Sequence, residues 1–217
     1  MAHRKNFIWL LVALLVFIIV VPLVDDFDLV SASIMRAAMF SWLMVIGVWS
    51  LRGFGKYFHV GIGLVVAGVV LSTLAVTLTS NIYFYASFAA ILAFALVTIR
   101  CVVKQIVRGD KISANRIVGA ISLYLLLGVT WSVAYAAIER FLPGSFDGIA
   151  ASGSTIWTSE WLYFSFVTLS TLGYGDIVPI TATARALTYM QAVAGQFYIA
   201  ILDAGLVASY ISDRKRS

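Results

Sequence analysis

The chain has 217 residues, of which 62% are hydrophobic and 12% charged, and its mean hydropathy is +0.99. Soluble globular domains have about 45–50% apolar and about 25% charged residues, so a water-soluble enzyme and a disordered chain are excluded. The 15 Lys and Arg residues outnumber the 10 Asp and Glu residues, which gives a net charge of +5. In a membrane protein such an excess marks the inner loops, so no nucleic-acid partner is expected.

Four apolar segments in the first half of the chain are predicted to span a membrane. Residues 7–24 are 18 uncharged residues, which as a helix rise about 27 Å, close to a hydrocarbon core of about 30 Å. A cleavable signal peptide is the alternative, although its apolar core usually has about 7–15 residues. The second segment is 30–51. Residues 60–99 are 40 uncharged residues, about twice the length of one span, so we expect them to turn back at residues 79–81.

Two longer apolar segments and one shorter segment follow in the second half. Residues 117–138 and 186–211 are long enough to cross a membrane, and Asp203 is the one formal charge in the latter. Residues 161–175 are 15 uncharged residues, which are too few to cross and predict a re-entrant segment. The expected fold class is an all-α membrane protein with six transmembrane helices, a re-entrant helix and the loop that follows it.

The basic residues provide a test of this count. Six spans place both termini on one side, and with the termini in the cytoplasm 12 of the 15 basic residues are cytoplasmic. The exceptions are Arg36, Arg140 and Arg185. This distribution follows the positive-inside rule and predicts a multi-pass protein of the cell membrane with cytoplasmic termini.

The loop of the re-entrant segment contains the motif Thr-Leu-Gly-Tyr-Gly-Asp at residues 171–176. Irregular backbone at membrane depth is tolerated only where protein buries it or where it lines an aqueous path. Glycine permits left-handed conformations that turn successive carbonyl groups toward one axis. Stacked rings of such carbonyls can replace the hydration shell of an alkali cation.

This motif resembles the selectivity filter of tetrameric potassium channels, with Leu172 in place of the commoner valine. The resemblance covers residues 117–217 and implies an outer helix, a pore helix, a filter and an inner helix. Because the chain has one filter motif, it implies a homotetramer around one central pore. The implied filter residues, in which the backbone carbonyls of the first four and the threonine hydroxyl bind K+, are Thr171, Leu172, Gly173, Tyr174 and Gly175.

Asp176 and Tyr163 are expected to support the filter. Family members that carry a tryptophan 13 residues before the filter aspartate use it to hydrogen-bond that aspartate, and this chain has Tyr163 at that position. The resemblance therefore implies that the Tyr163 hydroxyl reaches Asp176. The alternative is that Tyr163 only packs against neighbouring aromatic side chains.

Three residues of the last predicted span are candidate functional residues. Gly195 lies 22 residues after Gly173, the offset at which many family members carry a hinge glycine, while close helix packing is the alternative. Ile199 and Asp203 follow at intervals of four residues, on the face that the resemblance assigns to the cavity. We expect four copies of Asp203 to concentrate K+ and to bind intracellular Mg2+ or polyamines, unless Asp203 is merely solvated at the inner interface.

The first four spans resemble those of voltage-gated cation channels in layout alone. Residues 82–99 contain no basic residue, and Arg100, Lys104 and Arg108 follow only beyond the inner end of that span. Steep gating needs about 3–4 charges per subunit, so it is not expected. The domains are therefore residues 1–110, a four-helix N-terminal membrane domain without gating charges, and residues 111–217, the pore domain. The basic loops are expected to meet membrane lipids, anionic lipids included.

The expected function is passive, potassium-selective conduction without catalysis or a cofactor, with K+ as the permeant ion. One alternative is a subunit of a K+ uptake transporter, although such proteins carry four pore repeats and a single-glycine filter. Another alternative is a non-conducting membrane sensor.

Overall fold

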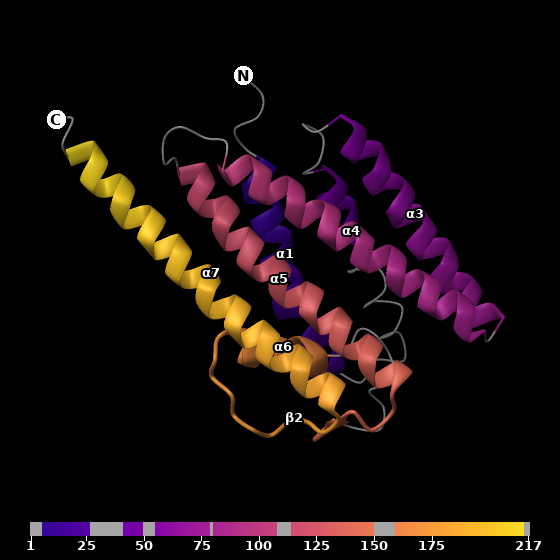
Figure 1. Cartoon of the computed structure of the whole chain (residues 1–217). Helices are drawn as coiled ribbons and strands as arrows, with labels where there is room; N and C mark the ends of the chain where they lie inside the picture. Colours follow the sequence, from indigo (N-terminus) through magenta and orange to yellow (C-terminus); the bar gives the residue numbers. More distant parts are fainter. Residues whose placement is uncertain are drawn as a thin grey trace.

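The computed structural model describes residues 6–26, 41–49, 55–78, 80–107, 114–149 and 159–214. These residues are helical apart from short connections and two strands of two residues, and residues 41–49 form one of the helices. The other elements, in chain order, are α1 Asn6–Asp26, α3 Lys56–Thr77, α4 Asn81–Val107, α5 Ala114–Phe141, β1 Phe146–Asp147, α6 Ser159–Leu169, β2 Val178–Pro179 and α7 Ala182–Arg214 (Figure 1).

Four described helices are long and apolar enough to span a membrane, which agrees with an all-helical multi-pass protein. They are Phe7–Val24, Lys56–Ala75, Asn81–Lys104 and Asn115–Phe141. The predicted turn within residues 60–99 is confirmed, since α3 ends at Thr77 and α4 begins at Asn81. Of the predicted second span only residues 41–49 are described. The predicted sixth span lies within α7, which is not among the four, so six spans remain a prediction.

Two of the N-terminal helices, α1 and α4, pack on α5, which is the central helix of the molecule (Figure 1). α3 and α4 lie side by side as a pair, and α1 and α4 each contact α5. A Cβ on Gly119 would lie 2.9 Å from the Phe7 ring, so the start of α1 crosses α5 where no side chain intervenes. At the other end of α5, Arg140 donates to Asn81 Oδ1 at 3.1 Å and lies 4.8 Å from the Phe84 ring centroid.

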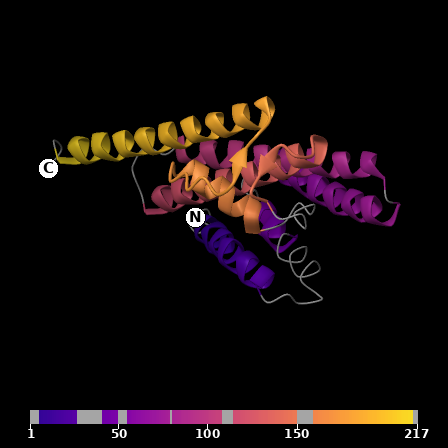
Figure 2. The same ribbon diagram turned by 90° about the horizontal axis from the view of Figure 1, so that it is seen from below.

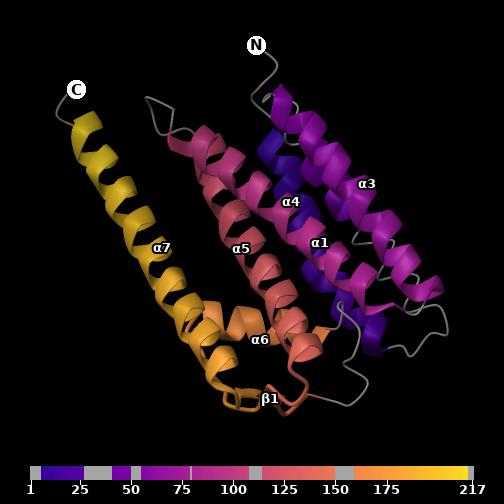
Figure 3. The same ribbon diagram turned by 45° about the vertical axis from the view of Figure 1, so that its right-hand side comes forward.

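α6 is a short helix that crosses between α5 and α7 at one end of the molecule (Figure 3). As predicted for a re-entrant segment, its 11 residues rise only about 17 Å. α1 begins and α7 ends at the opposite end (Figures 1 and 3). Seen from below, α7 runs along one side of the molecule, and none of the described helices covers its outer face (Figure 2).

An aromatic cluster holds α6 against α5 and β1. The rings of Tyr135, Phe146, Trp161 and Phe164 meet edge to face, with centroids 4.8–5.5 Å apart. All four side chains are buried. Edge-to-face aromatic pairs contribute about 0.5–1.5 kcal/mol beyond their burial, so the cluster anchors the first turns of α6.

Candidate functional site

The loop that carries the predicted filter folds back onto the last turn of α6. The amides of Leu172 and Gly173 donate to the Val167 carbonyl at 3.0 and 3.3 Å, and the Thr171 amide donates to Thr168 at 3.0 Å. The C-terminal carbonyls of a helix have no partner within it. Here the first residues of the loop supply the partners, so the position of α6 determines the position of the loop.

Alternate residues of this loop have a left-handed backbone. The φ angles are 59° at Thr171, 58° at Gly173 and 81° at Gly175. Glycine adopts this conformation at little cost, which is the role expected for the two glycines. A positive φ is unusual for a β-branched residue such as Thr171, and such strain is typically found at functional sites.

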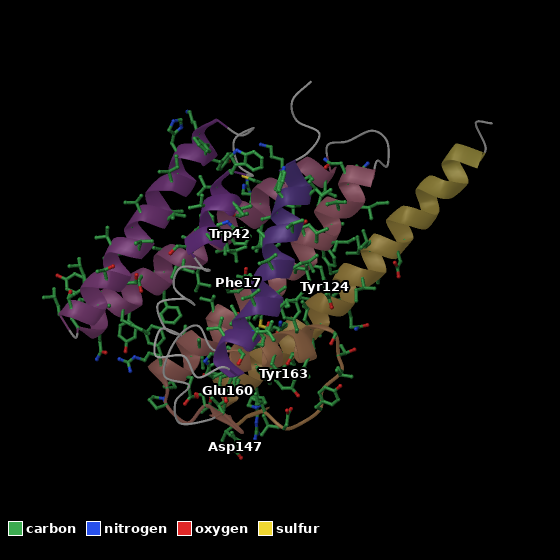
Figure 4. The ribbon with its side chains drawn as sticks, turned by 180° about the vertical axis from the view of Figure 1, so that it is seen from behind. Phe17, Trp42, Tyr124, Asp147, Glu160 and Tyr163 are labelled. Atoms are coloured by element: carbon green, nitrogen blue, oxygen red, sulfur yellow. The ribbon has the colours of Figure 1, made fainter. Side chains whose placement is uncertain are left out.

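The structure contains the hydrogen bond between Tyr163 and Asp176 that the resemblance implies. The Tyr163 hydroxyl donates to Asp176 Oδ2 at 2.5 Å, and the Tyr163 ring is parallel to that of Tyr174 with centroids 6.4 Å apart. Tyr163 therefore makes both of the contacts considered for it. Its side chain lies at the same end of the molecule as Glu160 and Asp147 (Figure 4).

The same bond shifts the ionisation of both partners. The hydrogen bond from Tyr163 lowers the pKa of the Asp176 carboxyl, and the backbone amides of Asp176 and Ile177 lower it further. The carboxylate in turn raises the pKa of Tyr163 to about 12, because a phenolate could not donate and would face a negative charge. Asp176 is therefore ionised and Tyr163 neutral at physiological pH.

A small sheet that no sequence pattern predicts braces the segment after the predicted filter. β1 pairs antiparallel with β2, so that Phe146 lies opposite Pro179 and Asp147 opposite Val178. Beyond β1, Gly148 has a φ of 85°, and a Cβ there would overlap the carbonyl oxygen of Asp176.

The loop before β1 is held by the end of α5. The Glu139 carboxylate accepts from the amides of Gly144 at 2.7 Å and of Phe146 at 3.1 Å. The Ile180 amide donates to the Ser145 carbonyl at 2.7 Å. Strands of two residues leave no periodic pattern in a sequence. The glycines at 144 and 148 are the residues in the sequence that indicate a turn on either side of β1.

At the inner end of the loop, α7 contacts the predicted filter through Gln196. Its Nε2 donates to Thr171 Oγ1 at 3.2 Å, and this hydroxyl donates to the Ser170 carbonyl at 2.7 Å. A hydroxyl has one donor and two acceptor sites, so one lone pair of Thr171 remains for a cation. Gln196 was not predicted from the sequence, because it lies outside the four-residue spacing of residues 195, 199 and 203.

Gly195 lies in close contact with α6, which is the alternative to a hinge role. It is buried, and a Cβ there would overlap the carbonyl oxygen of Leu169. α7 continues as one helix through this position. The contact explains a glycine at 195 by packing, and the hinge stays a prediction.

Ile199 and Asp203 are both exposed on α7. Asp203 lies seven residues after Gln196, so the two side chains project from nearly the same face of α7. The face that reaches Thr171 therefore also carries Asp203.

Residues 120–211 match a protein-family model described as "Ion channel". The chain is 41% identical to the two pore potassium channel c of Oryza sativa subsp. japonica over 90 residues, which are 42% of this chain and 18% of that protein. It is 29% identical to the inward rectifier potassium channel Kirbac3.1 of Paramagnetospirillum magnetotacticum over 92 residues, 41% of this chain and 27% of the other.

A third relative is matched over most of its length. The chain is 31% identical to the potassium channel protein kcv of Paramecium bursaria Chlorella virus 1 over 71 residues, which are 31% of this chain and 76% of the viral protein. By contrast, the chain spans less than a third of the two relatives above. No solved structure matches the chain.

Proposed function

Because this chain belongs to the ion channel family and carries a potassium channel pore domain, we propose that it conducts K+ passively and selectively as a homotetramer. It is a multi-pass membrane protein of a channel family and not an enzyme. We place it in the cell membrane with six spans and with both termini in the cytoplasm, because this orientation puts 12 of the 15 basic residues on the inner side.

The observation that carries the proposal is the backbone of the loop at residues 171–175. Left-handed residues alternate with ordinary ones there, and such a backbone can direct successive carbonyls to one side. The K+ ligands in this proposal are the carbonyl oxygens of Thr171, Leu172, Gly173 and Tyr174 and the Thr171 hydroxyl. Gly175 completes the filter, and Tyr163 and Asp176 support it.

The exposure of the same loop supports assembly. Residues 171–176 are all exposed in the single chain, with Leu172 at 55% and Tyr174 at 67%. Irregular backbone at membrane depth must be covered by protein or line a water-filled path. Three further copies around a common axis provide both conditions, since each loop is then flanked by its neighbours and faces the pore.

The exposed side of α7 fits this assembly. Large apolar side chains cover it over several turns, namely Tyr189, Met190, Val193, Phe197 and Ile201, each at least 51% exposed. In the tetramer these side chains contact neighbouring copies or lipid. Below the filter, Ile199 and Asp203 line the cavity, and α7 bends at Gly195 when the pore opens.

Reconstitution into liposomes tests the function. We expect K+ flux through the protein to far exceed Na+ flux, and we expect a particle of four 23.6 kDa chains. The matched control is Gly173→Ala, which places a side chain at a φ of 58° where no described atom of the same chain lies within 4 Å, so it perturbs the filter backbone without a clash inside the chain. Equal K+ and Na+ fluxes would contradict the selectivity, and no flux would favour the membrane sensor.

A further inference from the structure

Gln191 is a fully buried polar residue of α7 that has no role in the conduction pathway described above. Gln191 and two side chains that it contacts, Tyr135 and Ser165, are each 0% exposed. The three residues belong to α7, α5 and α6. A buried amide is costly unless it is hydrogen-bonded, so its partners determine how these helices fit together.

The donors of Gln191 and its carbonyl oxygen all have partners. Its Nε2 donates to the carbonyl oxygen of Ser165 at 3.0 Å and to Ser165 Oγ at 2.8 Å. Its Oε1 accepts from the hydroxyl of Tyr135. Ser165 Oγ then donates to the carbonyl oxygen of Gly128 at 2.7 Å. The bonds therefore run from α5 through α7 to α6 and back to α5.

This network lies one helical turn from a second contact between α6 and α7. Ser165 and Leu169 are four residues apart on α6, and Gln191 and Gly195 are four residues apart on α7. Across the two helices, the Gln191 amide is bonded to Ser165. One turn further along, the Leu169 carbonyl approaches Gly195 closely, because glycine has no side chain there. Residues four apart share one helix face, so the two helices touch along a single stripe.

The stripe ends where the filter begins. The last turn of α6 supplies the Val167 and Thr168 carbonyls that hold the amides of residues 171–173. A displacement of α6 at Ser165 is therefore transmitted to the loop by backbone hydrogen bonds alone.

We infer that Gln191 is a positioning residue for the selectivity filter: through Ser165, its amide fixes α6 on α7 and thereby sets the preference for K+ over Na+. The inference rests on the proposed function. It requires an amide, since a carboxylate has no N–H to donate to the two Ser165 oxygens. It also assigns Tyr135 the task of orienting that amide through Oε1.

The chain offers a matched pair of variants that separates positioning from general stability. Tyr135→Phe removes a bond between α5 and α7 that leads to Gln191. Tyr198→Phe removes another bond between the same two helices, the one from Tyr198 Oη to the Ala120 carbonyl at 2.5 Å, which does not reach α6. Both variants keep the aromatic ring, so both are expected to fold.

The first measurement is the K+/Na+ permeability ratio in liposomes. We expect Tyr135→Phe to lower it by up to about tenfold, the effect of leaving one buried polar group unpaired. Gln191→Leu should lower it at least as much, and the two changes combined should be less than additive because they break one network. Tyr198→Phe should leave the ratio unchanged. Equal ratios in Tyr135→Phe and the wild type would overturn the inference.

The second measurement does not depend on conduction. A ligand that binds the folded state raises its melting temperature, so the difference between melting in K+ and in Na+ reports selective binding at the filter. We expect Tyr135→Phe to reduce this difference and Tyr198→Phe to retain it while lowering both melting temperatures. If the wild type melts at a higher temperature in K+ than in Na+ but carries no flux, the proposed conduction is contradicted. A smaller melting difference in Tyr135→Phe would then still support Gln191 as a positioning residue for selective K+ binding. A wild type without the difference would overturn the inference.

Discussion

The hydroxyl of Tyr163 donates a hydrogen bond to the carboxylate of Asp176 at 2.5 Å, which ties α6 to the residue directly after the predicted filter. The two residues are 13 positions apart in the chain. The bond closes a loop around residues 171–175, in which Thr171, Gly173 and Gly175 are left-handed, so it opposes any outward relaxation of that backbone.

Tyr163→Phe should destabilise the conducting conformation. It keeps the ring that lies parallel to Tyr174 and removes only the hydrogen bond. We expect faster loss of current during sustained opening and a shorter mean open time in single-channel recordings. Tyr85→Phe is a control, because that ring stacks on Phe141, far from the filter in the sequence. Unchanged open times in Tyr163→Phe would contradict a supporting role.

The shift in ionisation predicts a flat response to mild external acid. The pKa of Asp176 in the folded state lies below its usual 3.8. The stabilisation from its ionised carboxylate is therefore complete above pH 3.8 and is lost only as the pH falls through the lower pKa of the folded state. We expect K+ flux to be constant between pH of about 5 and 8 and to fall only below about pH 4. In Tyr163→Phe, the loss of K+ flux in acid should begin at a higher pH, because the hydrogen bond that lowers the pKa of Asp176 is gone. A half-maximal fall near pH 6 would refute this assignment.

Gly148→Ala should destabilise the outer mouth more than Gly144→Ala does. Both glycines have a positive φ, 85° and 80°, but a Cβ at 148 would overlap the Asp176 carbonyl, while one at 144 meets no atom of the described residues within 4 Å. We expect about 1 kcal/mol of backbone strain for Gly144→Ala and about 2–4 kcal/mol for Gly148→Ala. Thermal unfolding of the reconstituted protein measures both. Equal melting temperatures for the two variants would show that the contact at Asp176 is unimportant.

Gln196→Leu should tighten K+ binding at the inner end of the filter. The amide draws on a lone pair of Thr171 Oγ1, so its removal leaves that oxygen a better cation ligand. Since a neutral hydrogen bond contributes about 0.5–1.5 kcal/mol, the half-saturating K+ concentration should fall by less than about tenfold. Val193→Leu is the control, because Val193 is an exposed residue of the same helix with no bond to Thr171. A rise in the half-saturating concentration would contradict this role of Gln196.

Asp203→Asn should abolish block by internal Mg2+. Four carboxylates facing one cavity attract a divalent cation, and four amides carry no charge. We expect currents of the wild type to decrease with internal Mg2+ at depolarised voltages, and currents of Asp203→Asn to be insensitive to it. Asp213→Asn makes the same change of charge ten residues further along α7. Identical block in Asp203→Asn and the wild type would show that Asp203 does not line the ion path.

The sequence by itself determined the membrane class, the approximate positions of most described helices and the motif of the predicted filter. These properties are local: the length of an uncharged run decides whether a helix can cross a bilayer, and two glycines around Tyr174 specify a backbone that few other residues adopt. The resemblance to potassium channels also implied the bond between Tyr163 and Asp176, because family members with a tryptophan 13 residues before the filter aspartate use it for such a bond.

Only the tertiary structure decided which polar groups meet across helices. Gln191, Ser165 and Tyr135 are separated by up to 56 residues, and each is an ordinary residue in its own segment, so no local pattern distinguishes them. The sequence also could not assign the role of Gly195, because a hinge and a close helix contact both favour glycine. Nor could it reveal that Gly148 lies against the Asp176 carbonyl. Long-range contacts depend on how whole helices cross, and side-chain packing determines that crossing only after all of the helices have come together.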